Sequence, residues 1–296
     1  MSVELLRLDT EDGDIEEDLV VEGEGIYHVD MSMDPPEVPL KGWIAITRAR
    51  IRTSDWFTLY HFLDWAVCLL VILAVEGPLN LFVTPHEVFF LEGDYSQMYP
   101  FESSTVPNWA LVLVMNLPPF ITTVCIILQR KDNVNKRHEI HHAILSWLMA
   151  CTINFMFCDT VKYACGRHRP DYFARQAENI SVFEQKNAHL SFPSGHSSGS
   201  FTSMTFLFLW ICGQTRMFSR GHFFGLLAAG IPLYFSTWVA VTRVQNYKHN
   251  YSDILAGILL GLISGSIGYL MNFPSILDLN SHRPKNKKNP SSPLPE

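Results

Sequence analysis

The apolar residues of this chain are gathered into blocks long enough to cross a lipid bilayer, which limits the folds that the chain can adopt. Such a crossing takes roughly 20 apolar residues when they form an α-helix. Six blocks are candidates, and the fourth extends back through the small residues after His196: 56–74, 109–128, 140–161, 201–212, 223–241 and 254–273. We therefore predict an all-α integral membrane protein that folds as a bundle of six transmembrane helices. In the last block Gly257, Gly261 and Gly265 recur every four residues, which favours close helix packing within the bundle over dimerisation.

The N-terminal 40 residues differ in composition from the apolar blocks. They contain thirteen acidic side chains against the single basic Arg7, and no helical stripe of apolar residues can be followed there. A segment of high charge and low hydrophobicity buries too little apolar surface to fold. We predict an acidic disordered cytosolic tail (1–40), not a signal peptide. An interfacial segment (41–55), the six-span domain (56–273) and a basic cytosolic C-terminal tail (274–296) then follow.

The orientation of the spans follows from basic charge, because short cytosolic loops are enriched in Lys and Arg. Basic residues precede the first block and follow the second, fourth and sixth, whereas residues 76–107 contain no Lys or Arg. Both termini are therefore expected in the cytosol, with the intervening segments on the lumenal or extracellular side. The outer segments after the third and fifth blocks break this rule, since they contain Lys162, Arg167, Arg169, Arg175, Lys186, Arg243 and Lys248. Basic residues on the disfavoured side indicate an anionic ligand.

Three polar clusters lie on that outer side: KYACGRHRP at 162–170, FPSGHSS at 192–198 and TRVQNYKHNYSD at 242–253. Lys162, Arg169 and Arg243 can surround a phosphoryl group, whose oxygens Arg and Lys stabilise in the transition state. Ser194 and Gly195 open the fourth span, where a hydroxyl group and backbone N–H groups can face an anion.

The histidines of the last two clusters can divide the chemistry of phosphate-ester cleavage. Of His196 and His249, one imidazole can attack phosphorus while the other protonates the leaving oxygen near neutral pH. Asp253 follows His249 by four residues. From there its carboxylate can bond one ring nitrogen of the histidine and leave the other nitrogen as the nucleophile.

These clusters resemble the three-part signature of the type 2 phosphatidic acid phosphatase superfamily, written K-x6-R-P, P-S-G-H and S-R-x5-H-x3-D. The first two parts match in full, and the third has Thr242 in place of Ser, which keeps the hydroxyl group. Asn246 and Asn250 stand where lipid phosphatases often have Asp and His, which bears on substrate preference more than on activity. The span count and spacing extend the resemblance over residues 50–273. Together with PSGHSS and the segment YPFESSTVP at 99–107, they look most like the lipid phosphate phosphatase family.

The resemblance implies a metal-independent hydrolase without a cofactor, with its active site at the non-cytoplasmic interface of the plasma membrane or an endomembrane. It assigns His249 as the nucleophile that forms a phosphohistidine, and His196 as the general acid. The substrates it implies are phosphatidate, lysophosphatidate, diacylglycerol pyrophosphate and sphingoid phosphates. No nucleic-acid partner is expected, whereas a homo-oligomer stays open.

Two rival functions use the same residues: a transferase that moves a phospho-headgroup between lipids, and a catalytically silent lipid-binding relative. A transporter with an anion site is less favoured, because the clusters lie at one face and not at the membrane midplane. Arg167 is expected to contact phosphate, with a solvated loop charge as the alternative. Arg175 and Lys186 are interpreted as ordinary loop charges, and Asp159 as the partner in a hydrogen bond or of a nearby cation. Asn179 begins the sequon Asn-Ile-Ser and is a glycosylation candidate on the outer side.

Overall fold

A computed structural model of the chain describes residues 4–6, 18–22, 25–29, 59–88, 93–130, 133–176 and 180–285. The chain divides into two units, Met1–Ser54 and Asp55–Glu296. Asn179 and the C-terminal tail from residue 286 lie outside the described residues.

The first unit contains three short strands, β1 (Glu4–Leu6), β2 (Asp18–Glu22) and β3 (Gly25–Val29). They form an antiparallel sheet in the order β1-β2-β3, with Val20 opposite both Leu5 and Tyr27. These strands depart from the all-α prediction and lie where a tail without secondary structure was expected. The disordered character of the other residues in 1–40 stays a prediction, because they lie outside the described residues.

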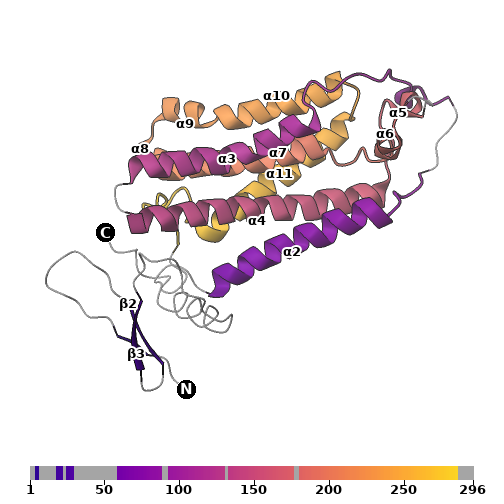
Figure 1. Cartoon of the computed structure of the whole chain (residues 1–296). Helices are drawn as coiled ribbons and strands as arrows, with labels where there is room; N and C mark the ends of the chain where they lie inside the picture. Colours follow the sequence, from indigo (N-terminus) through magenta and orange to yellow (C-terminus); the bar gives the residue numbers. More distant parts are fainter. Residues whose placement is uncertain are drawn as a thin grey trace. The chain divides into compact units, whose positions relative to one another are not determined.

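The described part of the second unit is helical. Its elements in chain order are α2 (Leu59–Phe82), the 3₁₀-helix η1 (Tyr95–Gln97), α3 (Asn108–Gln129), α4 (Asn133–Cys165), α5 (Tyr172–Arg175), α6 (Val182–Asn187), α7 (Gly195–Thr215), α8 (Met217–Arg220), α9 (Phe223–Ala229), α10 (Ile231–Gln245) and α11 (Tyr251–Asn272). Figure 1 shows the long helices running side by side, with α5 and α6 at one end of the bundle.

Each apolar block of the sequence falls largely within one of these helices or within the α9–α10 pair. By length and composition, three described helices can cross a membrane: α3, residues 136–165 of α4, and α11. The α9–α10 pair makes a fourth candidate if its two helices count as one span. The fifth predicted span is therefore not one straight helix, since the pair bends by 43° at its break around Gly230.

Helix α7 is the centre of the bundle and packs against α3, α4, α10 and α11. Most of its residues from Ser197 to Leu207 are fully buried. Glycine on α11 permits the closest of these approaches: a Cβ atom at Gly257 would lie 2.7 Å from the carbonyl oxygen of Ser194, and one at Gly261 would lie 2.6 Å from Cβ of Phe201. The interpretation of these glycines as packing residues within the bundle is thus confirmed.

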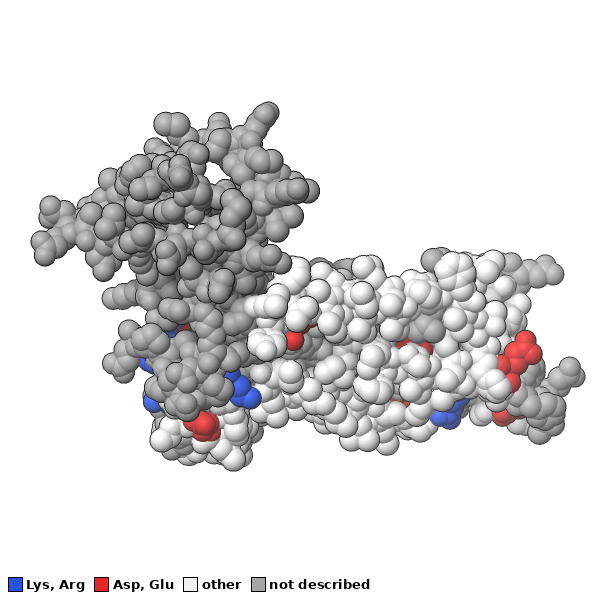
Figure 2. Space-filling view, turned by 90° about the horizontal axis from the view of Figure 1, so that it is seen from below, with Lys and Arg blue, Asp and Glu red and all other residues white. Residues whose placement is uncertain are grey.

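The outer surface of the bundle is apolar along much of its length. Large apolar side chains are exposed there, among them Leu70, Leu73, Phe120, Leu255 and Leu259. Figure 2 shows one such flank, on which most residues between the two ends are uncharged. A contiguous apolar surface around helices that satisfy their own backbone hydrogen bonds is what a bilayer covers. The second unit is therefore that of a membrane protein.

Candidate active site

The three polar clusters meet at one end of the bundle, as their positions at the ends of the helices predicted. The backbone N–H of Ser194 donates to the carbonyl oxygen of Asp253 (3.0 Å), which joins the second cluster to the third. The N–H of Ser191, the residue directly before the second cluster, donates to the carbonyl oxygen of Arg167 (2.9 Å) and so ties the start of that cluster to the first. Nη1 of Arg169 donates to the carbonyl oxygen of Lys248 (3.3 Å), which closes the ring of contacts.

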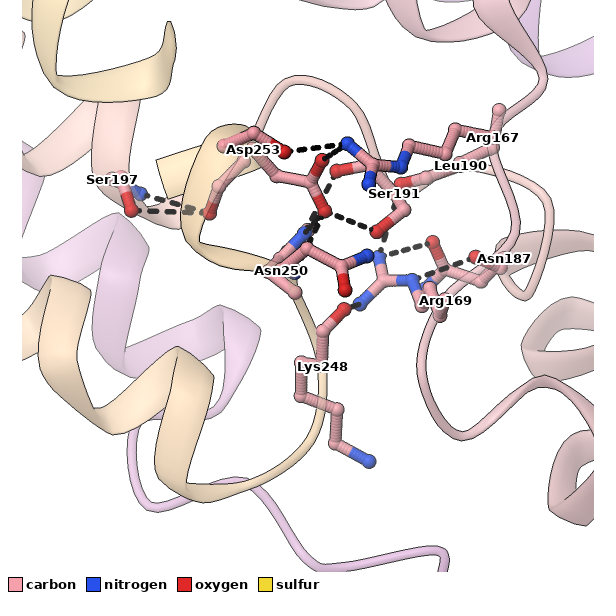
Figure 3. A network of polar contacts seen from close by, with 12 residues as sticks. Arg167, Arg169, Asn187, Leu190, Ser191, Ser197, Lys248, Asn250 and Asp253 are labelled. Atoms are coloured by element: carbon pink, nitrogen blue, oxygen red, sulfur yellow. Dashed lines mark hydrogen bonds and ion pairs between the residues drawn. The ribbon is translucent and has the colours of Figure 1, made fainter. Parts of the chain in front are cut away.

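Arg169 is buried, and its guanidinium is held by oxygen acceptors from two neighbouring loops. Nε and Nη2 donate to the carbonyl and side-chain oxygens of Asn187 at 2.8 and 3.0 Å, and Nη2 also reaches the carbonyl oxygen of Leu190 at 3.4 Å. Burial, together with the nearby charge of Arg175, lowers the pKa of Arg169 to about 10. The group therefore remains a cation at neutral pH, and Figure 3 shows the contacts that hold it.

Arg243 lies in the last turn of α10 and is 1% exposed. Its Nε and Nη2 both donate to the hydroxyl oxygen of Thr242, at 3.2 and 3.0 Å, and Nη2 also donates to Oδ1 of Asn246 at 3.3 Å. The hydroxyl group of Thr242 in turn donates to the carbonyl oxygen of Val239 (2.6 Å). The hydroxyl group that Thr242 shares with the serine of the family pattern therefore makes hydrogen bonds in the site.

Lys162 approaches the start of α7 from the last turn of α4. Its Nζ forms an ion pair with Oδ1 of Asp159 at 2.9 Å, which confirms the interpretation of Asp159 as the partner of a nearby cation. A Cβ atom at Gly195 would lie 2.7 Å from Nζ of Lys162, so a larger residue there would displace the ammonium group from this position. Ser194 caps α7 by accepting from the N–H of Ser197, and the peptide bond before Pro193 is cis.

His249 lies in the short connection between α10 and α11 and is 3% exposed. Its Nδ1 donates to the carbonyl oxygen of Ser191 at 2.8 Å. A carbonyl oxygen only accepts, so Nδ1 carries the proton and Nε2 of the neutral ring keeps its lone pair. Burial, and after it the charge of Arg169, lowers the pKa of His249 to about 4, which keeps the ring neutral at physiological pH.

The structure does not contain the direct hydrogen bond that was expected between Asp253 and His249. Oδ2 of Asp253 lies 3.9 Å from Nδ1 of His249, an ion-pair distance too long for a hydrogen bond. The buried carboxylate accepts instead from Oγ of Ser191 (2.6 Å), the N–H of Asn250 (2.8 Å) and Nη1 of Arg167 (2.7 Å), as Figure 3 shows. Asp253 is therefore connected to His249 through Ser191 and lies at ion-pair distance from the ring.

Arg167 is half exposed and bound to Asp253, so it is more than a solvated loop charge. The same nitrogen, Nη1, also donates to the hydroxyl oxygen of Ser252 at 2.7 Å. A contact with phosphate stays a prediction. The interpretation of Arg175 as an ordinary loop charge was wrong: this side chain is 2% exposed and forms ion pairs with Asp171 and Glu184.

His196 lies in the first turn of α7, and its Nε2 donates to the carbonyl oxygen of Val106 at 3.0 Å. Val106 belongs to the 93–107 segment, which leads from the end of α2 into α3 and contacts all three clusters. The N–H of Tyr99 donates to the carbonyl oxygen of Pro170 (3.1 Å), and its ring stacks on that of Tyr247 at 4.8 Å. The N–H of Thr105 donates to Oδ1 of Asn246 (3.0 Å).

The 93–107 segment also supplies an aromatic face for a cation. Nζ of Lys248 lies 4.0 Å from the centre of the Phe101 ring and forms an ion pair with the buried carboxylate of Asp171 at 3.0 Å. The sequence did not predict that residues 93–107 or Ser191 belong to the site. The string 99–107 was interpreted only as part of the resemblance to a family. Most of these contacts run through backbone atoms, which leave no pattern in the residue types.

A small cavity of about 180 Å³ lies beside Asp253, lined by Val88, Ser96, Gln97, Arg167, His168 and Asn250. His168 packs within its wall, where its ring stacks on Tyr172 at 4.0 Å and its Nδ1 bonds Oε1 of Gln97 at 3.0 Å. Burial, with a smaller contribution from His189, lowers the pKa of His168. Among the described residues no group of three or more His, Cys, Asp or Glu side chains is placed to hold a metal ion.

Comparisons with known proteins find one family to which this sequence is similar. The family model described as the PAP2 superfamily matches residues 143–276, a range that contains all three clusters. A PA-phosphatase related-family protein of Dictyostelium discoideum is 36% identical over 245 residues, which cover 80% of this chain and 89% of that protein. Lipid phosphate phosphatase 2 of Arabidopsis thaliana is 34% identical over 236 residues, covering 74% of this chain and 79% of the relative.

A more distant relative is diacylglycerol pyrophosphate phosphatase 1 of Saccharomyces cerevisiae, 25% identical over 235 residues, with 72% of this chain and 80% of that protein covered. No solved structure is similar enough to this chain to count as a match. On the extent and identity of these similarities, the chain belongs to the PAP2 superfamily of type 2 phosphatidic acid phosphatases.

Proposed function

We propose that this protein is a lipid phosphate phosphatase that hydrolyses phosphatidate and related lipid phosphomonoesters. The observation that carries the proposal is a buried neutral histidine, His249, whose Nδ1 is fixed by a carbonyl oxygen beside the buried cation Arg169. A nucleophile with a free Nε2 next to a fixed guanidinium is suited to attack on phosphorus. The relatives named above, which are phosphatases of lipid phosphates by name, support the same class of reaction.

In the first step Nε2 of His249 attacks phosphorus, a bond forms between nitrogen and phosphorus, and the bond from phosphorus to the lipid oxygen breaks. The negative charge of the bound phosphate favours protonation of the His196 ring. The protonated ring gives its proton to that departing oxygen, which leaves as an alcohol such as diacylglycerol. Lys162, Arg169 and Arg243 stabilise the charge on the remaining phosphoryl oxygens, with Ser194 and the N–H groups at the start of α7. The product is a phosphohistidine at His249.

In the second step His196, now neutral, takes a proton from water as that water attacks phosphorus. The bond between nitrogen and phosphorus breaks, inorganic phosphate leaves, and His249 returns with its lone pair on Nε2. Asp253, 3.9 Å from Nδ1 of His249, stabilises the positive charge that the ring carries while it is phosphorylated. Every proton in this cycle is held by a side chain or by water, so it needs no metal ion or cofactor.

We place six spans in the membrane: α2, α3, α4, α7, the α9–α10 pair and α11. Both termini then face the cytosol, and the site lies at the lumenal or extracellular interface, where a lipid enters sideways from the bilayer. Glycosylation at Asn179 would test this sidedness. We expect glycosidase treatment to increase the gel mobility of the wild-type protein from eukaryotic membranes but not that of the Asn179→Gln variant. An unchanged mobility of the wild type would count against glycosylation there.

Phosphate release from short-chain phosphatidate, measured in membranes that contain the protein and EDTA, tests the proposed reaction. We expect the wild-type protein to release phosphate in the presence of EDTA. His249→Ala and His196→Ala should each reduce this release at least about 1,000-fold, and the control His222→Ala should leave it unchanged. His222 is exposed and directly precedes α9, which lies at the opposite end of the bundle from α5 and α6 (Figure 1). Appearance of a new phospholipid without free phosphate would instead identify a headgroup transferase. Neither product from any of the proposed lipids would identify a silent lipid-binding relative.

A further inference from the structure

Ser191 stands two residues before the PSGH cluster, outside the three signature segments, and is completely buried. Each of its polar groups reaches a different part of the site. Its N–H donates to the carbonyl oxygen of Arg167 (2.9 Å), its Oγ donates to Oδ2 of Asp253 (2.6 Å), and its carbonyl oxygen accepts from Nδ1 of His249 (2.8 Å). One buried serine therefore links the proposed nucleophile to the carboxylate.

The geometry makes this link the main hydrogen-bonded connection between the two residues. The carboxylate and the ring are 3.9 Å apart, beyond hydrogen-bond distance. Oδ2 of Asp253 is occupied by Oγ of Ser191 and the N–H of Asn250, and Oδ1 by Arg167. With its acceptors used in this way, the carboxylate holds Ser191 (Figure 3). Ser191 in turn holds the imidazole of His249 through its carbonyl oxygen.

A fixed carbonyl on Nδ1 has two consequences for the histidine. It selects the tautomer with the proton on Nδ1, which leaves the lone pair on Nε2. It also fixes the plane of the ring, and a nucleophile held in the attacking geometry reacts much faster than one that rotates. Both effects depend on where the Ser191 carbonyl points. Its Oγ bond to Asp253 and its N–H bond to Arg167 set that direction.

We propose that Ser191 is a positioning residue of the phosphatase reaction: it holds Asp253 through its hydroxyl group and orients His249 through its carbonyl oxygen. This inference rests on the proposed function, since it assigns the ring of His249 as the nucleophile. Ser191 does not touch the phosphate and acts through the two residues that it joins.

The test compares Ser191→Ala and Ser191→Thr with Ser236→Ala in the purified full-length protein. Ser236 is a matched control, because it is also completely buried and its hydroxyl group donates to the carbonyl oxygen of Ser200 on α7. We expect Ser191→Ala to lower kcat about 10- to 100-fold while KM for short-chain phosphatidate stays within about twofold, the loss typical of a hydrogen bond to a charged group. Ser191→Thr, which keeps the hydroxyl group, should restore most of the turnover.

The pH profile separates positioning from a general loss of packing. Without Oγ of Ser191, Asp253 is released to accept the Nδ1 hydrogen of His249 directly, which favours the protonated ring. The acid limb of kcat/KM should therefore move to higher pH in Ser191→Ala and stay in place in Ser236→Ala. Equal impairment of Ser191→Ala and Ser191→Thr, or wild-type kcat and pH profile in Ser191→Ala, would overturn the inference.

A probe that needs no turnover distinguishes this inference from the proposed function. Orthovanadate adopts the five-coordinate geometry of phosphoryl transfer, and its binding to the purified protein is measured as an increase in Tm. We expect a smaller increase for Ser191→Ala than for the wild type and Ser236→Ala. If Ser191→Ala shows this smaller increase in Tm but the wild type releases phosphate from no lipid, the phosphatase proposal is overturned and the positioning role of Ser191 is kept. If the wild-type protein releases phosphate and Ser191→Ala has the same turnover and vanadate response, the phosphatase proposal is kept and the role of Ser191 is overturned. If the wild type neither releases phosphate nor binds vanadate, both proposals are overturned.

Discussion

The hydroxyl oxygen of Thr242 accepts hydrogen bonds from two nitrogens of Arg243, at 3.2 and 3.0 Å, and so fixes the direction of a guanidinium that is 1% exposed. Arg has many rotamers of similar energy, and a cation that binds a phosphoryl group must be held in one of them. The threonine at a position where the family pattern has serine therefore orients the cation next to it.

The first prediction follows from this pair. Thr242→Val keeps the shape of the side chain but removes the acceptor, so kcat/KM for phosphatidate should fall about tenfold. Thr242→Ser should stay close to the wild type. Thr237→Val, on an exposed turn of the same helix, serves as the control, because its hydroxyl group bonds the carbonyl oxygen of Leu233 within that helix. Equal activities of the Thr242→Val and wild-type proteins would show that Arg243 does not need this acceptor.

A second prediction concerns stability in mild acid. Burial first, with Arg169 and Lys162 adding to it and Asp253 opposing it, lowers the pKa of His249 to about 4, below the value near 6.5 in an unfolded chain. Between these values the unfolded state binds the proton more readily, so the stability due to this group is present above about pH 6.5 and is lost as the pH falls toward 4.

Thermal unfolding of the purified protein at pH 7 and pH 5 measures this effect. We expect the fall in Tm between the two pH values to be smaller in His249→Asn than in the wild type, since asparagine does not titrate. His222→Asn, an exposed histidine changed in the same way, should behave as the wild type does. An identical pH dependence in all three proteins would mean that His249 is protonated as easily in the folded state as in the unfolded one.

The convergence of the three clusters could be predicted because each cluster sits at the end of an apolar block. The alternation of those blocks across a bilayer places 162–170, 192–198 and 242–253 on the same side, whatever the details of the fold. The signature residues then predict which side chains gather there. Side-chain identity and span spacing were sufficient for this part of the site.

The rest depended on information that residue types do not carry. The bonds of His249 to Ser191 and of His196 to Val106 end on backbone carbonyl oxygens, which every residue has. The break at Gly230 was missed because mean hydropathy is the same for a straight and a bent span. Arg175 was taken for a surface charge because its partners, Asp171 and Glu184, are found only once the loop is folded.

A third prediction addresses the 93–107 segment. Tyr99→Ala removes the stacking on Tyr247, one of the contacts that hold this segment over the clusters. We expect kcat to fall several-fold and the backbone amides of residues 93–107 to exchange hydrogen faster. Tyr95→Ala is the matched control, because Tyr95 lies in the same segment and is 86% exposed. Unchanged exchange rates in Tyr99→Ala would show that the stacking does not hold the segment in place.

A fourth prediction concerns the contact between α7 and α11. The Cβ atom of Gly261→Ala would meet the Cβ atom of Phe201 at 2.6 Å and the carbonyl oxygen of Ser198 at 2.7 Å. Separating the two helices to make room should cost about 1–3 kcal/mol and lower Tm by several degrees. At Gly77→Ala in α2 the added carbon meets no atom of the described residues within 4 Å. This variant should leave Tm unchanged or raise it slightly, because alanine favours a helix more than glycine does. A stable Gly261→Ala protein would mean that the packing of these helices is looser than the structure has it.

Rapid quenching with ³²P-labelled short-chain phosphatidate tests whether Nε2 of His249 carries the phosphoryl group between the two proposed steps. Peptide mapping of the quenched protein should find a label that is stable in alkali and labile in acid, as a phosphoramidate is, on the peptide that contains His249. The His222→Ala protein should be labelled to the same extent, and the His249→Ala protein should carry no label. A label on another residue, or phosphate release that persists in His249→Ala, would contradict the account.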